Sequence, residues 1–188
     1  MSELEQLPIP LLAWYRENAR VLPWRSEPEP YRVWVSEIML QQTRVAAVLD
    51  YYRRFLEAAP SPAALALLPE EQLMKLWQGL GYYSRARNLQ KAARQIVERH
   101  GGVFPSRYED IRALAGVGDY TAGAIASIAF GLPVPAVDGN VLRVTARVTG
   151  GCHGPVEKAK AIYDYVTGYV DYRFQPGYLQ LGSIADLC

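Results

Sequence analysis

Leu114-Ala-Gly-Val-Gly-Asp-Tyr-Thr-Ala122 is the stretch that decides the fold. Its two glycines interrupt an apolar run that resumes as the Ala- and Ile-rich sequence up to Phe130, which predicts a helix, a tight hairpin and a second helix. Gly116 and Gly118 permit backbone conformations that a residue with a Cβ resists. They also leave the amides at the second helix's N-terminus facing outward, which favours an anion such as phosphate. A plain turn between packed helices is the alternative for this stretch alone.

The rest of the chain also has helical periodicity. Apolar residues recur at intervals of three and four, while strand patterns are scarce, so the sequence predicts an all-α fold without internal repeats. A charged row on one of these helices, made of Arg85, Arg87, Lys91 and Arg94, fits a solvated face and phosphate contact equally well. Residues 26–30 are expected to form a loop, and the expected helices are 8–20, 31–41, 45–58, a short one from 62, 70–78, 84–99, 107–115, 120–130, 139–148, 156–170 and one from 176 or 177 to the end.

Composition narrows the class of protein. At 188 residues and 50% hydrophobic, the chain can bury its own core. It has no apolar run of the roughly 20 residues that a membrane helix needs and no signal peptide, so we expect a cytoplasmic protein without membrane contact. We also expect a monomer. A net charge of +1 restricts any nucleic-acid footprint to a local surface. Two cysteines, Cys152 and Cys188, provide neither a disulfide framework nor metal-ligand spacing.

A second segment, Pro135-Ala-Val-Asp-Gly-Asn-Val141, follows the hairpin after about one helix. Together the two segments resemble the helix-hairpin-helix superfamily of DNA base-excision glycosylases. Within it, three motifs are most similar to MutY-type adenine DNA glycosylases: Ser36-Glu-Ile-Met-Leu-Gln-Gln-Thr-Arg44, Gly79-Leu-Gly-Tyr-Tyr-Ser-Arg85 and Tyr120-Thr-Ala-Gly-Ala-Ile-Ala-Ser-Ile-Ala-Phe130. The resemblance implies one catalytic domain, 1–188, with two helical lobes and a DNA-binding cleft between them. A middle lobe would cover about 28–134, and the N-terminal helix would pack with 135–188 as the second lobe.

Two carboxylates are the candidate catalytic groups, since breaking the bond to adenine needs an acid for the leaving base and an anion for the sugar cation. Glu37 has apolar neighbours that would raise the pKa of its carboxyl by desolvation. A glutamate on the wet face of an amphipathic helix is the alternative, and the resemblance favours the catalytic role. Asp138 is expected to cap the helix that starts near Gly139, where the helix dipole keeps it ionised. By resemblance, Asn140 orients Asp138 or the water; otherwise it is polar surface.

Tyr120 occupies the position where bifunctional relatives of the endonuclease III type place a lysine. Without that amine no Schiff base forms, so the resemblance implies a monofunctional enzyme that leaves the DNA strand intact. A packed aromatic is the alternative for this tyrosine.

The remaining candidate residues would contact DNA. By resemblance, Gln42 and Thr43 reach the base opposite the flipped nucleotide, and Tyr82 is an intercalating wedge. Trp24 and Arg25 match residues that line the adenine pocket. Gln42 and Thr43 would otherwise only finish the preceding helix in water.

The resemblance also raises the question of whether the chain binds a cofactor. Most glycosylases of this type carry a 4Fe-4S cluster on four cysteines that begin just after the motif Phe174-Gln-Pro-Gly-Tyr-Leu-Gln-Leu-Gly182. Only Cys188 lies near that region, and a single thiol cannot hold the cluster, so we expect no metal and no cofactor. The sequence therefore suggests a clusterless member or a truncated catalytic piece. Without the family's second domain, which recognises 8-oxoguanine, the preference for adenine opposite 8-oxoguanine over adenine opposite guanine should be modest.

These features imply one main function. The resemblance indicates base-excision repair, by hydrolysis of the N-glycosidic bond of adenine mispaired with 8-oxoguanine or guanine, with double-stranded DNA as the partner. A thymine glycosylase for T:G mismatches remains an alternative, because related enzymes share the pattern at Tyr120 and Asp138. A DNA-binding module that has lost activity is the other alternative, although two intact carboxylates argue against it.

Overall fold

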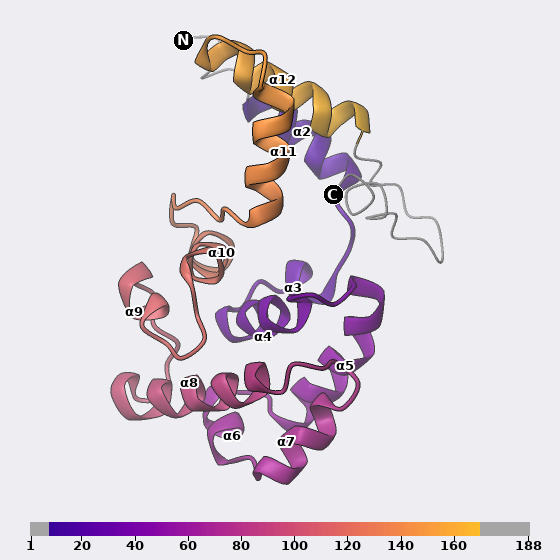
Figure 1. Ribbon diagram of the computed structural model, residues 1–188. Helices are drawn as coiled ribbons and strands as arrows, with labels where there is room; N and C mark the ends of the chain where they lie inside the picture. The colour runs from indigo at the N-terminus through magenta and orange to yellow at the C-terminus, as the bar shows by residue number, and fades with distance from the viewer. Residues whose placement is uncertain (1–7, 170–188) are drawn as a thin grey trace. The chain divides into compact units, whose positions relative to one another are not determined.

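The computed structural model describes residues 8–169, which fall into two compact units. One is continuous, Leu22–Ala136, and the other combines the described parts of Met1–Val21 and Val137–Cys188. All regular elements between residues 8 and 169 are helices, which confirms the all-α prediction (Figure 1). The helix expected from residue 176 or 177 lies outside the described residues.

Proline begins several of the helices, which suits its fixed φ and missing amide hydrogen. Pro23, Pro30 and Pro62 are the first residues of their helices, and Ser61 caps the third of these by accepting from the Ala64 amide. Most predicted bounds lie within two residues of those observed. The helices are α2 (Pro8–Asn18), α3 (Pro23–Ser26), α4 (Pro30–Leu40), α5 (Val45–Ala58), α6 (Pro62–Leu67), α7 (Glu70–Trp77), α8 (Ser84–His100), α9 (Tyr108–Arg112), α10 (Asp119–Phe130), α11 (Gly139–Thr149) and α12 (Pro155–Tyr169).

Two local expectations were wrong. No helix was expected at α3, yet Pro23 starts one turn that the amide of Ser26 closes on the Leu22 carbonyl at 3.0 Å. The helix expected over 107–115 is shorter, because it ends at Arg112 before the hairpin begins. Short elements of this kind have too few residues to show a periodic pattern.

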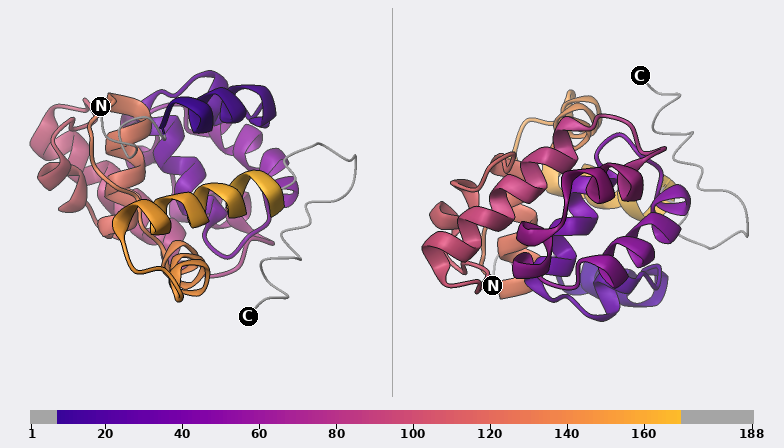
Figure 2. Two further views of the ribbon diagram at one scale, coloured as in Figure 1. Left: turned by 90° about the horizontal axis from the view of Figure 1, so that it is seen from above. Right: turned by 90° about the horizontal axis from the view of Figure 1, so that it is seen from below.

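Helix α4 lies at the centre of the Leu22–Ala136 unit. It contacts α3, α5, α8 and α10, and Figures 1 and 2 show it enclosed by these helices. Its side chains Trp34, Val35 and Met39 are fully buried. The Trp34 ring packs edge-on against Phe104, with ring centroids 5.5 Å apart. Apolar side chains of α4 therefore pack against its neighbours on each side of the helix that faces the core.

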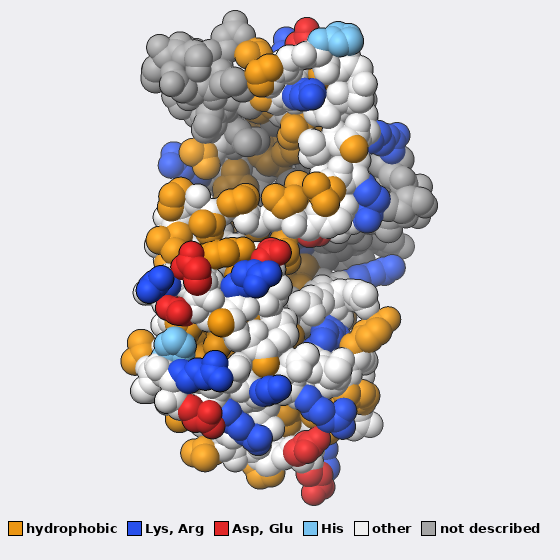
Figure 3. All heavy atoms as spheres, turned by 60° about the vertical axis from the view of Figure 1, so that its left-hand side comes forward, with side chains coloured by type: hydrophobic (Ala, Val, Ile, Leu, Met, Phe, Trp, Pro, Cys, Tyr) orange, Lys and Arg blue, Asp and Glu red, His pale blue; other side chains and the backbone are white. Residues whose placement is uncertain are grey.

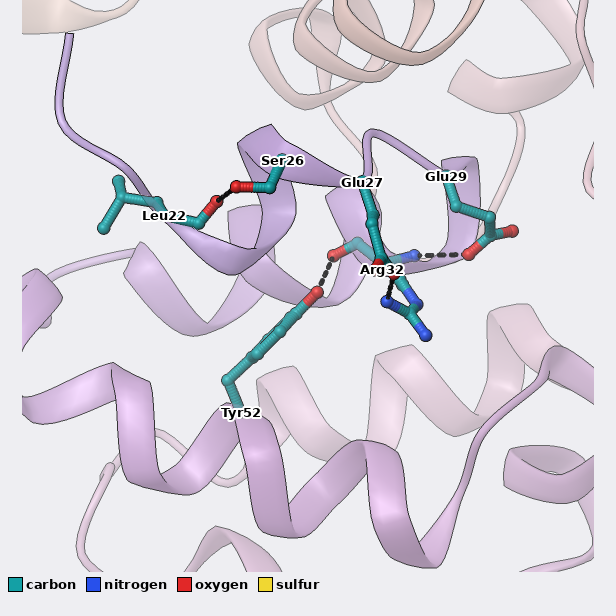
Figure 4. Close-up of polar contacts among 6 residues, drawn as sticks. All are labelled: Leu22, Ser26, Glu27, Glu29, Arg32 and Tyr52. Atoms are coloured by element: carbon teal, nitrogen blue, oxygen red, sulfur yellow. Dashed lines mark hydrogen bonds and ion pairs between the residues drawn. The ribbon is translucent and has the colours of Figure 1, made fainter.

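Polar contacts fix the start of α4 (Figure 4). Glu29 is the N-cap, and its carboxylate accepts from the backbone amides of Tyr31 and Arg32 at 3.2 and 3.1 Å. The Arg32 side chain pairs with Glu27, while the Tyr52 hydroxyl donates to the Arg32 carbonyl at 3.4 Å. Burial raises the pKa of Tyr52 to about 12, so this hydroxyl stays a donor at neutral pH. The Glu29 cap and the Tyr52 hydroxyl together fix the residue at which α4 begins.

The glycine hairpin joins α9 to α10 as predicted, but its two glycines differ. Gly116 has a φ of +74°, and a Cβ there would lie 2.7 Å from the Cβ of Asn88, so both conformation and space require glycine. Gly118 caps α10 with a φ of −94°, which any residue adopts, and a Cβ there would meet nothing within 4 Å. The expectation of a special backbone is confirmed for Gly116 and wrong for Gly118.

This difference makes a matched pair of variants. Gly116→Ala should lower the free energy of unfolding by about 1–3 kcal/mol, because the residue must adopt a left-handed conformation and displace α8 at Asn88. Gly118→Ala should change it little, since its Cβ points into open space. Urea unfolding followed by circular dichroism measures both. Equal losses in the two variants would contradict the hairpin geometry.

The other unit contains α2, α11 and α12, and α12 contacts both of its neighbours. Asp138 caps α11, as predicted. No helix within residues 8–169 has the length and hydropathy needed to cross a bilayer.

Candidate functional site

Glu37 is the one half-buried side chain in a run of buried ones. The residues on either side, Ser36 and Ile38, are buried, as are Val35 and Met39. Glu37 therefore lies neither on a fully wet face nor deep in the core. A carboxyl in this setting is partly desolvated and still accessible, as a proton donor to a bound substrate must be.

Two loops of the same unit contain residues in a left-handed conformation. Gln42, just after α4, has a φ of +58°, and Tyr82, between α7 and α8, has a φ of +45°. They are the only non-glycine residues with positive φ in the described part of the chain. Such conformations cost free energy in residues with a Cβ and tend to occur at functional sites. The Tyr82 side chain is 65% exposed, which leaves its ring available to a ligand.

Thr43 lies beside Gln42 and closes the turn after α4. Its amide donates to the Leu40 carbonyl at 3.2 Å, and its hydroxyl donates to the Gln41 carbonyl at 3.4 Å. The hydroxyl thus supports the turn while the Gln42 side chain remains exposed.

The row of basic residues on α8 does not form one surface. Arg85 turns inward and donates to backbone carbonyls of α4 and of the loop before α8, so both interpretations of this residue were wrong. Arg87 pairs with Glu70 at 3.0 Å, and Arg94 donates to the Ala66 carbonyl at 3.3 Å. Lys91 is exposed. Figure 3 shows lysine and arginine interspersed with acidic side chains over the lower part of the drawn face.

Asp138 belongs to a chain of polar side chains at the start of α11. One carboxylate oxygen accepts from the Val141 amide at 2.7 Å, and the other accepts from the Asn140 side-chain amide at 3.0 Å. Arg143 donates in turn to the Asn140 side-chain oxygen. Asn140 is thus placed to orient Asp138, and its support from Arg143 was not predicted from the sequence.

The connection that leads to Asp138 packs directly on α10. A Cβ added at Gly123 would lie 2.2 Å from the Pro135 carbonyl oxygen, so the backbones of helix and connection touch there. Sequence reasoning missed this contact. The available signal was a glycine in the middle of a helix, where it is normally unfavourable unless close packing requires it.

The N-terminus of α10 is the predicted phosphate site. No side chain caps α10 at Gly118, so its first turn keeps the outward-facing amides that an anion needs. Asp119 lies in this turn and pairs with Arg112. The hydrogen bond from Arg112, together with its charge, lowers the pKa of the Asp119 carboxyl. Tyr120 follows, and its side chain is 38% exposed.

Trp24 and Arg25 differ in their surroundings. The Trp24 ring is buried edge-on against Tyr52, with ring centroids 5.1 Å apart. Arg25 is exposed. In this structure Trp24 contributes to the core, and its role in a pocket stays a prediction.

The possible metal ligands that the structure describes do not gather at one place. Among residues 8–169, no group of three or more His, Cys, Asp or Glu side chains is placed to hold a metal ion. Cys152 is half-buried with a free thiol, and Cys188 lies outside the described residues. Two cysteines in the sequence cannot supply the four thiolates of a 4Fe-4S cluster, so these residues do not fit that group.

The candidate residues thus form two local groups. Glu37, the loops of Gln42 and Tyr82, and the hairpin belong to Leu22–Ala136, whereas Asp138 and Asn140 belong to the other unit. The glycine hairpin and the capping aspartate both lie within a stretch that matches a known protein family. Residues 35–163 match the family described as HhH-GPD superfamily base excision DNA repair protein, and the chain belongs to this superfamily.

Two individual relatives within this superfamily are adenine DNA glycosylases. The chain is 52% identical over 147 residues to the adenine DNA glycosylase of Mus musculus, covering 73% of this chain and 28% of the relative. It is 40% identical over 186 residues to the adenine DNA glycosylase of Arabidopsis thaliana, covering 85% of this chain and 29% of that relative. These relatives confirm the similarity seen in the motifs, and the chain spans less than a third of their length.

A solved structure supports the fold. A thermostable thymine-DNA glycosylase superposes with a TM-score of 0.72 over 94% of this chain and 91% of its own, at 24% sequence identity.

Proposed function

We propose that this chain is the catalytic part of an adenine DNA glycosylase, which removes adenine mispaired with 8-oxoguanine or guanine from duplex DNA. The observation that carries this is the contrast between two carboxyl groups. Glu37 is half-buried among buried neighbours, while Asp138 is fixed at a helix N-terminus by the Val141 amide and Asn140. A partly desolvated acid and a preorganised anion are what glycosidic cleavage requires. The named activity of the curated relatives supports the same assignment.

The reaction would use the two carboxyl groups in turn. Glu37 protonates ring nitrogen N7 of the flipped adenine, which makes the base a better leaving group. The C1′–N9 bond then breaks, its electron pair leaves with adenine, and Asp138 stabilises the positive sugar. Glu37, now a carboxylate, takes a proton from water as the water oxygen bonds to C1′. The products are free adenine and an abasic site, and no step uses a metal or a cofactor.

The exposed loops would hold the DNA. Tyr82 inserts its ring into the base stack, and Gln42 and Thr43 contact the base opposite the flipped adenine. The amides near Gly116 and Gly118 would bind a backbone phosphate, and Trp24 and Arg25 would lie beside the adenine. We propose that the protein acts as a monomer, in the compartment that contains the DNA.

The identity of the released base tests this function. The chain is incubated in excess over duplexes that contain A opposite 8-oxoguanine, A opposite guanine or T opposite guanine, and the free bases are identified by mass spectrometry. We expect adenine from the first two duplexes and no thymine from the third. Release of thymine alone would replace this proposal with a thymine glycosylase, and binding without release would indicate a DNA-binding module.

Tyr120 leads to a prediction about the product. Because a tyrosine follows the hairpin, no amine forms an imine with the sugar at this position, and the abasic strand should stay intact until alkali is added. Borohydride added during turnover should trap no substantial protein–DNA adduct. The matched variant Tyr120→Lys places an amine there and should increase trapping. Efficient trapping by the unmodified chain would contradict the monofunctional assignment.

A further inference from the structure

The guanidinium of Arg85 joins two loops that are far apart in the sequence. Its Nη1 donates to the carbonyls of Ile38 at 2.9 Å and Met39 at 3.3 Å, and also to that of Gln41. Its Nη2 donates to the carbonyls of Leu80 at 2.9 Å and Gly81 at 3.3 Å. One side chain thus binds the C-terminal end of α4 and the loop between α7 and α8.

Aromatic rings cover the same guanidinium. It lies 5.5 Å from the ring centroid of Trp77 and 5.7 Å from that of Tyr82. The Trp77 indole nitrogen also donates to the Gly81 carbonyl at 3.0 Å. Burial lowers the pKa of Arg85, which agrees with a charge turned toward the protein. The guanidinium therefore binds backbone carbonyl groups of the protein and not a DNA phosphate.

Arg85 binds carbonyls in two segments, and each segment runs directly into a residue with a strained backbone conformation. Gln42 follows Gln41 directly, and Tyr82 follows Gly81 directly; both have positive φ. A left-handed conformation at a residue with a Cβ persists only when its surroundings hold it. The five hydrogen bonds of Arg85 provide that restraint on both loops.

We propose that Arg85 is a positioning residue that holds the Gln42 loop and the Tyr82 loop as a single DNA-probing unit. This proposal rests on the proposed function only in that Gln42 and Tyr82 contact DNA. Lysine could not replace it, because an ammonium has three donors on one atom, whereas the guanidinium presents donors on two separate nitrogens in a planar fork. Because Arg85 holds both loops, insertion of the Tyr82 ring into the base stack is coupled to the contact of Gln42 with the opposite base.

The test is a mutant cycle that does not depend on catalysis. The ligand is a duplex with a tetrahydrofuran abasic analogue opposite guanine, and its affinity is measured by fluorescence anisotropy at one salt concentration. Arg85→Lys should weaken binding about ten- to hundredfold, the range for losing hydrogen bonds to a charged group. In the Gln42→Ala/Tyr82→Ala background the same change should have less than about a twofold effect, since its two targets are already absent. The control Arg99→Lys, at the exposed far end of α8, should bind like the unmodified chain.

A purely structural role for Arg85 gives a different outcome. It would weaken binding equally in both backgrounds, and that result, or no loss at all, would overturn the proposal. Thermal melts establish that each variant is folded at the assay temperature, and Arg85→Gln replaces the lysine variant if that one does not fold. If the unmodified chain binds this duplex but releases no adenine from the mismatched duplexes described above, the proposed function fails while the cycle still tests Arg85.

Discussion

Replacement of Glu37 by glutamine should abolish adenine release. The amide keeps the size and polarity of the side chain, but it can neither donate the proton to adenine nor accept one from water. Each proton transfer typically contributes about 10²–10⁴-fold to a rate, and Glu37 would serve in two of them. Single-turnover release from a duplex with adenine opposite 8-oxoguanine is the measurement.

Control measurements separate this effect from a folding defect. Glu57→Gln changes an exposed glutamate of α5 in the same way and should leave the rate unchanged. The Glu37 variant should still bind the mismatched duplex, because binding does not require the proton. If Glu37→Gln released adenine at the rate of the unmodified chain, Glu37 would have no part in the chemistry.

Replacement of Asp138 by asparagine should slow the same step while preserving the fold. The asparagine oxygen can still accept from the Val141 amide, so the cap of α11 survives. The charge that stabilises the sugar cation is lost, and removal of such a preorganised group typically costs about a hundredfold or more in rate. Binding to the mismatched duplex should persist.

A second substitution at this position separates the two roles of the carboxylate. Asp138→Ala removes cap and charge together and should also lower the free energy of unfolding by about 0.5–2 kcal/mol. An asparagine variant with an undiminished rate would show that Asp138 is only a helix cap.

Much of the fold follows from local signals in the sequence. Pro62 begins a helix, Asp138 caps α11, and the glycine hairpin joins α9 to α10. Each of these depends on the backbone preferences of one or two residues, which do not change with their surroundings. The single turn of α3 escaped detection because it also depends on packing: Pro23 was visible in the sequence, but the burial of Trp24 was not.

The unpredicted part of the site depends on contacts between distant residues. Arg85 follows a basic pattern that is typical of an exposed helix face, yet it binds carbonyls 44 and 47 residues earlier in the chain. No periodicity in the sequence indicates that a charge turns inward. The positive φ of Gln42 and Tyr82 and the contact of Gly123 with Pro135 have the same origin, since tertiary packing imposes them.

The most direct test of the central claim is strand cleavage at adenine, measured with the chain in excess over end-labelled duplexes. Adenine lies opposite 8-oxoguanine in one duplex and opposite thymine in the other, and each reaction is divided into a sample with alkali and a sample without it. We predict cleavage at the adenine opposite 8-oxoguanine, only after alkali, and no cleavage of the paired A:T duplex, because a stacked and paired adenine costs more to flip. Absence of alkali-dependent cleavage in the 8-oxoguanine duplex, despite binding to it, would contradict the assignment of this chain as an adenine DNA glycosylase.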